Sequence, residues 1–327
     1  MLKERRELPQ PSAVQKLWEI TKPEDDQEAD VYFDHLETLI PIRQDLWFWV
    51  PFDRQKKSGG KRQIVPAAAP LGYIQHQLAN WIFHNLSQGE DYCYTGRNVK
   101  SAVEPHIDKP YALVCDLQNA FDHATRAKIA HWLPLYDKRF RDEKVLNLML
   151  DLLTFEGRAP QGCATTPYVF NMIVAQMDRH MDLVARPLGI ESITRYSDNI
   201  CFSAKSEFDA KELEAQVRRV ATSFGFPLSW VKSYEGSVDY LGVTIQDGTV
   251  RIEDERAGEF LNRIYQMIES GDPRQHYKSV LGIQSWMRQI YGPNIPKDIA
   301  RVLNIYFRLV DKPPIPLEEL WDKPTVG

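Results

Sequence analysis

The sequence has few cysteines. It contains four in 327 residues, and they lie far apart with no Cys-x-x-Cys or Cys-His spacing: Cys93, Cys115, Cys163 and Cys201. Zinc sites and disulfide frameworks need ligands or partners at such spacings. Neither is therefore indicated, and buried free thiols are the simpler interpretation.

Long hydrophobic runs are also absent. No segment reaches the roughly 18 consecutive apolar residues that a membrane-spanning helix requires. The first residues, MLKERRELPQ, carry charges and a proline where a signal peptide would be apolar. The sequence therefore predicts a soluble protein of the cytoplasm with no membrane partner.

The chain lacks an excess of positive charge. Its formal net charge is -5 and its pI is near 5.9. These values argue against indiscriminate nucleic-acid binding, because that affinity usually comes from lysine and arginine neutralising phosphates. Positive charge is instead gathered in one glycine-containing segment, which carries Arg54, Lys56, Lys57, Lys61 and Arg62. Nucleic-acid contact would have to depend on such local clusters.

The residues that are present predict a packed α+β protein. Hydrophobic residues make up 43% of the chain, which is enough for a large core. Hydrophobic periodicity predicts helices over residues 13–20 and 71–86, and a Ser-Gly-Gly turn predicts a hairpin over residues 56–65. From about Glu253 the pattern is purely helical, with helices expected over residues 256–268, 276–291 and 297–310.

Two acidic residues stand at the ends of predicted strands. The apolar run Tyr111 to Leu117 is typical of a buried strand, and Asp116 lies at its end. Ile193 to Ser203 is expected to form two strands joined by a tight turn at Asp198, since Asp and Asn tolerate a positive φ. A half-buried carboxylate there is costly unless it is paired or binds a metal. Either acid taken alone is explained as well by capping of backbone N–H groups.

Further motifs surround these acids. A Pro160-Gln161-Gly162 turn precedes a predicted amphipathic helix, whose inward face would be Val169, Met172, Ile173, Met177, His180 and Val184. Lys232 follows the second acid, and then comes Tyr240-Leu241-Gly242. Asp247-Gly248 lies between two further predicted strands and is a hairpin signal.

This order of motifs resembles the reverse transcriptases of bacterial retrons and group II introns. The resemblance runs from about Lys56 to Gly242; each motif is weak, but six in the correct order are specific. It implies an α+β right-hand polymerase. Its parts would be an N-terminal helical extension (1–45), fingers (46–110, with part of 125–165), a palm with an antiparallel sheet (111–252), and a helical thumb with a Pro-rich tail (253–327).

The resemblance also assigns expected roles to individual residues. The expected catalytic residues are Asp116, Asp198, Asn199 and Lys232, the last as the lysine that protonates the leaving pyrophosphate. Two Mg2+ ions, or Mn2+ in their place, would be held by Asp116, Leu117 and Asp198. The incoming nucleotide would be bound by Lys57, Lys61, Arg62, Phe121, Gln161, Gly162 and Tyr196, and the primer grip would be Tyr240, Leu241 and Gly242.

Alternatives remain open for two of these residues. Phe121 stands where the family places a ring that would clash with a ribose 2′-hydroxyl, but it is also a candidate for a core phenylalanine under the strand. Lys232 is equally well explained as an exposed lysine.

The sequence departs from the family pattern in three places. The family usually has Tyr-x-Asp-Asp, whereas Asn199 replaces the second acid here. Ala102 and His106 resemble the Asn-Ala-x-x-His element of retron enzymes, but Ser101 replaces the Asn and the spacing is one residue longer. The Val-Thr-Gly of retron enzymes is absent or shifted around Val243.

The implied function is RNA-directed DNA synthesis on a specific, structured noncoding RNA, in antiviral defence by kinship. The implied partners are that template, deoxynucleotides, the RNA/DNA product and an effector or accessory protein. Two rival hypotheses keep the fold: a polymerase-like RNA-binding or scaffold subunit, suggested by Asn199, and an RNA-dependent RNA polymerase, which Phe121 argues against.

Overall fold

The structure is a computed structural model that describes residues 12–39, 48–55, 59–86 and 97–311. The chain divides into two compact units, each assembled from segments far apart in the sequence. Unit 1 comprises residues 1–95, 116–185 and 212–230, and unit 2 comprises residues 96–115, 186–211 and 231–327. Helices occur together with antiparallel strand pairs, so the predicted α+β class is confirmed.

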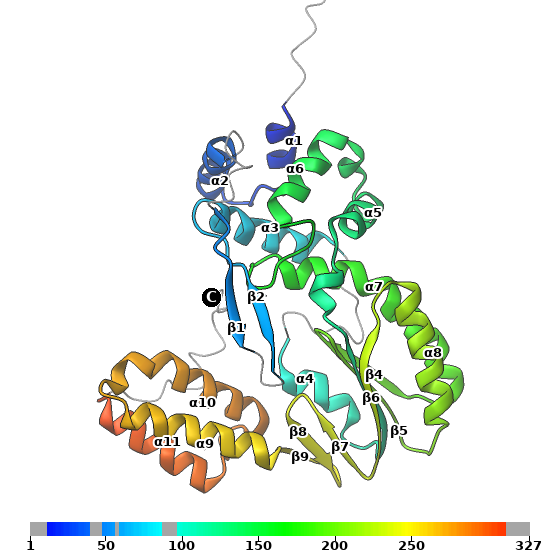
Figure 1. The fold of residues 1–327 in the computed structure, drawn as a ribbon, viewed down its shortest axis with the longest axis vertical. Helices are drawn as coiled ribbons and strands as arrows, with labels where there is room; N and C mark the ends of the chain where they lie inside the picture. Colours follow the sequence, from blue (N-terminus) through cyan, green and yellow to red (C-terminus); the bar gives the residue numbers. More distant parts are fainter. Residues whose placement is uncertain (1–11, 40–47, 56–58, 87–96, 312–327) are drawn as a thin grey trace, which may run out of the picture. The chain divides into compact units, whose positions relative to one another are not determined.

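Unit 1 is mainly helical (Figure 1). Its helices are α1 (Ala13–Thr21), α2 (Asp26–Leu39), α3 (Leu71–Asn85), α5 (Arg126–Tyr136), α6 (Glu143–Leu153), α7 (Thr166–Ala185) and most of α8 (Ala210–Ser223), with 3-10 turns η4 (Ala120–His123) and η5 (Lys138–Arg141). α1 and α3 occupy the ranges that periodicity predicts. The unit also contains the hairpin of β1 (Phe52–Gln55) and β2 (Lys61–Ile64), whose first strand begins earlier than predicted.

Helix α7 buries most of its predicted inward face. The four aliphatic positions from Val169 to Met177 are buried. His180 is exposed, however, and its ring Nδ1 lies 2.8 Å from the Gln176 carbonyl oxygen. The prediction for His180 was wrong because a polar ring at the edge of an apolar stripe can satisfy its nitrogen on its own helix while remaining in water.

The two larger sheets are built mainly by unit 2. β3 (Tyr111–Leu117), β4 (Ser192–Tyr196), β5 (Asn199–Ala204) and β6 (Leu228–Glu235) form one sheet in the order β4-β5-β3-β6. β7 (Ser237–Tyr240), β8 (Val243–Gln246) and β9 (Thr249–Ile252) form the other. β3 has the predicted bounds, and Asp247 and Gly248, at φ 49° and 71°, form the predicted turn between β8 and β9. α4 (Val99–Val103), η3 (Glu104–His106) and η6 (Arg186–Leu188) complete this part.

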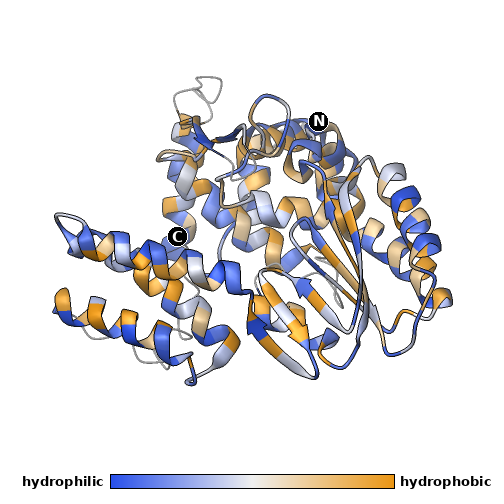
Figure 2. Cartoon of the chain, turned by 60° about the horizontal axis from the view of Figure 1, so that its bottom comes forward, coloured by the Kyte–Doolittle hydropathy of each residue, from blue (hydrophilic) through white to orange (hydrophobic). Residues whose placement is uncertain are grey.

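A helical group follows β9. It consists of α9 (Asp254–Glu269), η7 (Pro273–His276), α10 (Tyr277–Tyr291) and α11 (Lys297–Leu309). Hydrophilic and hydrophobic positions alternate along these helices (Figure 2), and the hydrophobic ones form a shared core that includes Ile264, Val280, Met287 and Tyr306. The predicted start of a helical region near Glu253 is therefore confirmed.

Other sequence predictions have mixed outcomes. Cys115, Cys163 and Cys201 are buried thiols outside any disulfide, as predicted, whereas Cys93 and Lys57 lie outside the described residues. Within the described ranges, none of the helices combines the length and hydrophobicity needed to cross a membrane. The fingers, palm and thumb boundaries stay predictions.

Candidate active site

Asp116 is held at the end of β3 by a neighbouring serine. Ser229 Oγ donates a hydrogen bond to Asp116 Oδ1 at 2.5 Å and lies 3.3 Å from the Asp116 carbonyl oxygen. Gln118 N donates to Pro227 O at 2.7 Å, which fixes the chain just beyond β3 against the segment before β6. The Asp116 side chain is half-buried. Ser229 was not identified from sequence; its position three residues before Lys232 was the available signal.

The basic hairpin and the Pro-Gln-Gly turn come together within unit 1. Val65 N, just after β2, donates to Gln161 O at 2.6 Å. Gly162 has φ +104°, and a Cβ added to it would lie 2.7 Å from Ile64 Cγ2. Only glycine permits this approach without strain. The segments next to two sets of expected nucleotide-binding residues thus meet, since Ile64 and Val65, just after Lys61 and Arg62, contact Gly162 and Gln161.

The described basic side chains of this hairpin, Arg54, Lys61 and Arg62, are exposed. Arg62 lies opposite Arg54 in the β1–β2 register, and Lys61 Nζ forms an ion pair with Asp53 Oδ2 at 3.1 Å. Like charges directly opposite each other in an antiparallel pair are destabilising, so an anion bound beside Arg54 and Arg62 would be stabilised. The hairpin is therefore suited to hold phosphate oxygens.

Phe121 has one packed face. It lies in η4, and its ring centroid is 5.2 Å from that of Phe170, which in turn packs on Phe226 at 5.8 Å. Phe170 and Phe226 are buried, whereas Phe121 is half-buried. This aromatic row supports the ring from one side, an arrangement that both the steric-gate and the core interpretation allow.

The Tyr-x-Asp hairpin forms in unit 2. β4 and β5 pair with Tyr196 opposite Asn199, and Ser197 adopts the left-handed backbone at φ 57°. The sequence prediction placed that conformation on Asp or Asn; Ser197 takes it because it is the first of the two turn residues. Asn199 Nδ2 donates to Asp198 Oδ1 at 3.1 Å. The substituted position therefore stabilises the neighbouring carboxylate as a hydrogen-bond donor.

A buried arginine lies under this turn. Arg195 is fully buried and donates from Nη1 to the Ser197 carbonyl oxygen at 3.0 Å. Burial also raises the pKa of the half-buried Tyr196 hydroxyl, which therefore stays protonated. The charged guanidinium of Arg195 thus stabilises the turn by donating to its backbone.

The expected primer-grip residues differ in exposure. Tyr240 is 2% exposed, its hydroxyl faces the interior, and burial raises its pKa well above the ordinary value. Leu241 and Gly242 have positive φ values of 56° and 80°, and a Cβ on Gly242 would lie 2.6 Å from Arg256 Cδ. Any contact of Tyr240 with a primer would therefore come from its backbone.

Lys232 is exposed on β6. Its Nζ lies 4.5 Å from the centroid of the Tyr234 ring. A cation over a ring face is weakly stabilised, by about 0.5–1 kcal/mol at exposed sites. This placement agrees with either interpretation of Lys232.

The donor atoms of the two acidic positions fit magnesium. Asp116, Asp198 and Asn199 offer carboxylate and amide oxygens, which are the ligands that Mg2+ prefers. Among the described residues, no group of three or more His, Cys, Asp or Glu side chains forms a metal site by itself. Mg2+ typically keeps several waters and phosphate oxygens beside one or two protein carboxylates.

Comparison with known proteins identifies the family. Residues 56–245 match the family described as reverse transcriptase (RNA-dependent DNA polymerase). The chain therefore belongs to the reverse transcriptase family, and the right-hand polymerase fold predicted from the sequence is that of this family.

Within the family the resemblance is to retron enzymes, as predicted. The chain is 23% identical over 283 residues to the retron Mx65 reverse transcriptase of Myxococcus xanthus. The match covers 79% of this chain and 65% of that relative, so the chain spans less than two thirds of its length.

Solved structures with a similar chain course include a foamy viral protease-reverse transcriptase in complex with double-stranded DNA, at TM-score 0.42 and 14% identity, covering 85% of this chain and 43% of that one. Telomerase from Candida albicans with a fragment of telomeric RNA matches at TM-score 0.43 and 10% identity, covering 83% and 56%.

Proposed function

We propose that the protein is an RNA-directed DNA polymerase that copies a structured noncoding RNA by two-metal nucleotidyl transfer. The supporting observation is that the family match over residues 56–245 includes both Asp116 and Asp198. Each of these carboxylates also has an ordered environment in its own unit, through Ser229 and Asn199 respectively. A cytoplasmic location, an effector or accessory partner and a role in antiviral defence belong to the same proposal.

The proposed mechanism assigns each residue a physical task. Asp116 and Asp198, with the Leu117 backbone, hold the divalent ions. Held there, two Mg2+ ions would supply activation of the primer 3′-hydroxyl and charge stabilisation of the leaving oxygen. Asn199 donates its amide N–H to Asp198 Oδ1 and so orients that carboxylate.

The nucleotide is bound by residues of the hairpin and the turn. Arg62 binds phosphate oxygens as a planar fork, and Lys61 adds a point charge. Lys57, Gln161, Gly162 and Tyr196 complete the proposed nucleotide site. Phe121 excludes a ribose 2′-hydroxyl, and Lys232 gives a proton to the leaving pyrophosphate.

Primer extension tests this proposal. The wild-type chain should extend an RNA-templated primer with deoxynucleotides in Mg2+ or Mn2+, and both Asp116→Ala and Asp198→Ala should abolish extension because each removes a metal ligand. Asp254→Asn is the control, since Asp254 is 92% exposed and forms a surface ion pair with Arg251. Extension by Asp198→Ala at the wild-type rate would refute the assignment.

A non-catalytic RNA-binding subunit is the second candidate, favoured by Asn199 in place of the family's second acid. It predicts that the wild type binds RNA but extends no primer with either metal. Ribonucleotide incorporation equal to deoxynucleotide incorporation would instead indicate an RNA polymerase. Sequencing the nucleic acid that copurifies with the protein identifies the template.

A further inference from the structure

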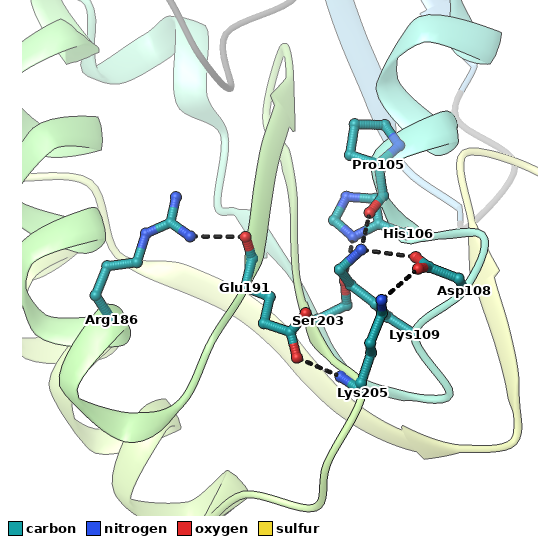
Figure 3. A network of polar contacts seen from close by, with 8 residues as sticks. All are labelled: Pro105, His106, Asp108, Lys109, Arg186, Glu191, Ser203 and Lys205. Carbon is teal, nitrogen blue, oxygen red and sulfur yellow. Dashed lines mark hydrogen bonds and ion pairs between the residues drawn. The ribbon is translucent and has the colours of Figure 1, made fainter.

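The Ala102–His106 element contains a buried histidine. Its side chain contacts both strands of the β4–β5 hairpin, which carries Asp198. His106 is fully buried. Its Nδ1 lies 2.6 Å from Ser203 Oγ on β5 (Figure 3). Its Nε2 lies 2.8 Å from Thr194 Oγ1 on β4. Thr194 pairs with Cys201 in the register, so Thr194 and Ser203 are diagonal neighbours. One imidazole ring therefore links a side chain of β4 to a side chain of β5, in addition to the backbone pairing of the two strands.

The direction of these hydrogen bonds can be deduced. Thr194 Oγ1 donates to the Ala102 carbonyl oxygen at 2.9 Å, because a carbonyl can only accept. The single hydroxyl hydrogen of Thr194 is thereby used, so Thr194 Oγ1 accepts from His106 Nε2–H. Burial, with the nearby Lys109 charge, lowers the His106 pKa to about 3, so the ring is neutral and Nδ1 accepts from Ser203.

The network continues to the residue next to Asp198. Tyr240 Oη lies 3.3 Å from Thr194 Oγ1 and 3.4 Å from the carbonyl oxygens of Thr194 and Asn199. The Tyr240 ring also meets the His106 ring edge to face, at 5.9 Å between centroids. The chain of contacts from His106 thus ends one residue from the acid.

Exposed ion pairs also link the segment after η3 to the segment after β5. Lys205 Nζ lies 3.0 Å from Asp108 Oδ2, and Lys109 Nζ lies 2.7 Å from Asp108 Oδ1 (Figure 3). The Asp108 and Lys205 side chains are each more than half exposed. Solvent screens such exposed pairs, whereas a buried polar group that loses its partner is left with its full desolvation penalty. The buried hydrogen bonds of His106 therefore hold this segment against the β4–β5 hairpin more strongly than the exposed ion pairs of Asp108 do.

We propose that His106 is a positioning residue that holds the β4–β5 hairpin, and with it Asp198, in the geometry needed for metal binding. The role of Asp198 as a metal ligand rests on the proposed function; the ordering of the hairpin does not. In this proposal the Ala102–His106 element contacts and orders the β4–β5 hairpin in the protein interior. Its histidine cannot touch RNA, because the side chain is fully buried.

The consequence of removing the ring is local. In His106→Ala, the Ser203 hydroxyl loses its acceptor and Thr194 loses its donor, and a void replaces the imidazole. The hairpin gains freedom to shift, and a misplacement of about 1 Å near a reacting centre can cost about a hundredfold in rate. His106→Gln retains an acceptor and an N–H donor, so it should recover part of that loss.

The test combines hydrogen exchange with kinetics. In the full chain, His106→Ala should speed amide exchange in peptides covering residues 196–201 relative to the rest of unit 2. Primer extension by the same variant should show kcat lowered by about tenfold or more, with the KM for deoxynucleotides changed less than about twofold. His106→Gln should lie between His106→Ala and the wild type in both measurements.

Two controls separate positioning from general destabilisation. Val302→Ala removes buried volume from the helical group far along the chain, so it should lower stability without accelerating exchange at residues 196–201. Asp108→Asn removes the outer ion pairs and should leave kcat unchanged. Exchange at residues 196–201 that is unaltered in His106→Ala, or altered as much by Val302→Ala, would overturn the proposal. If the wild type extends no primer while His106→Ala still loosens the hairpin, the proposed function fails and the ordering role stands.

Discussion

Acid should destabilise the protein through His106 in particular. Its pKa is lowered to about 3 by burial, with Lys109 adding to the effect, while the unfolded chain has an ordinary histidine pKa of about 6.5. Between these values the unfolded state binds a proton that the folded state does not. Stability from this group is therefore lost as the pH falls below about 6.5, and the loss continues to about 3.

The size of the effect follows from the same two values. Lowering the pH from about 7 to about 5 should cost the wild type about 2 kcal/mol from this residue alone. That loss is a large part of the roughly 5–15 kcal/mol by which folded domains are stable.

Urea unfolding of the wild type and His106→Gln at both pH values measures this effect. Glutamine does not titrate, so the variant should lack the His106 contribution. His123, whose pKa is also lowered by burial, is present in both proteins and cancels in the comparison. Equal losses of unfolding free energy in the two proteins between the two pH values would refute the reasoning.

Three further predictions concern the candidate site. Gly162→Ala should lower the free energy of unfolding by about 1–3 kcal/mol, because the added Cβ clashes with Ile64 and the backbone has a positive φ. Gly157→Ala is the control and should lower it less, since Gly157 also has a positive φ of +79° but faces open space. Equal losses of unfolding free energy in urea would contradict this prediction. Phe121→Ala should raise ribonucleotide relative to deoxynucleotide incorporation in primer extension, whereas lower stability with an unchanged ratio would make Phe121 a core residue. Asn199→Asp should lower the Mg2+ concentration for half-maximal extension, since a carboxylate replaces an amide beside Asp198. A metal titration showing no decrease would contradict the expectation that added negative charge beside Asp198 strengthens metal binding.

Local sequence patterns determined several elements closely. An unbroken apolar run gave strand β3 its predicted bounds and placed Asp116 at its end. The Asp247-Gly248 turn was predictable because two successive positive φ values need such residues. The helices after Glu253 follow from an apolar period that extends over whole turns. The order of the motifs along the chain identified the family.

Contacts between distant segments were decided by the tertiary structure. The bond between Val65 and Gln161, the serine on Asp116 and the histidine between β4 and β5 each join residues about 90 or more positions apart. The burial of Tyr240 and the exposure of His180 likewise depend on what packs against them. Periodicity reports which face of an element is apolar, but it carries no information on which other element covers that face. The sequence therefore determined the residues that carry the chemistry, and packing determined which groups hold them in place.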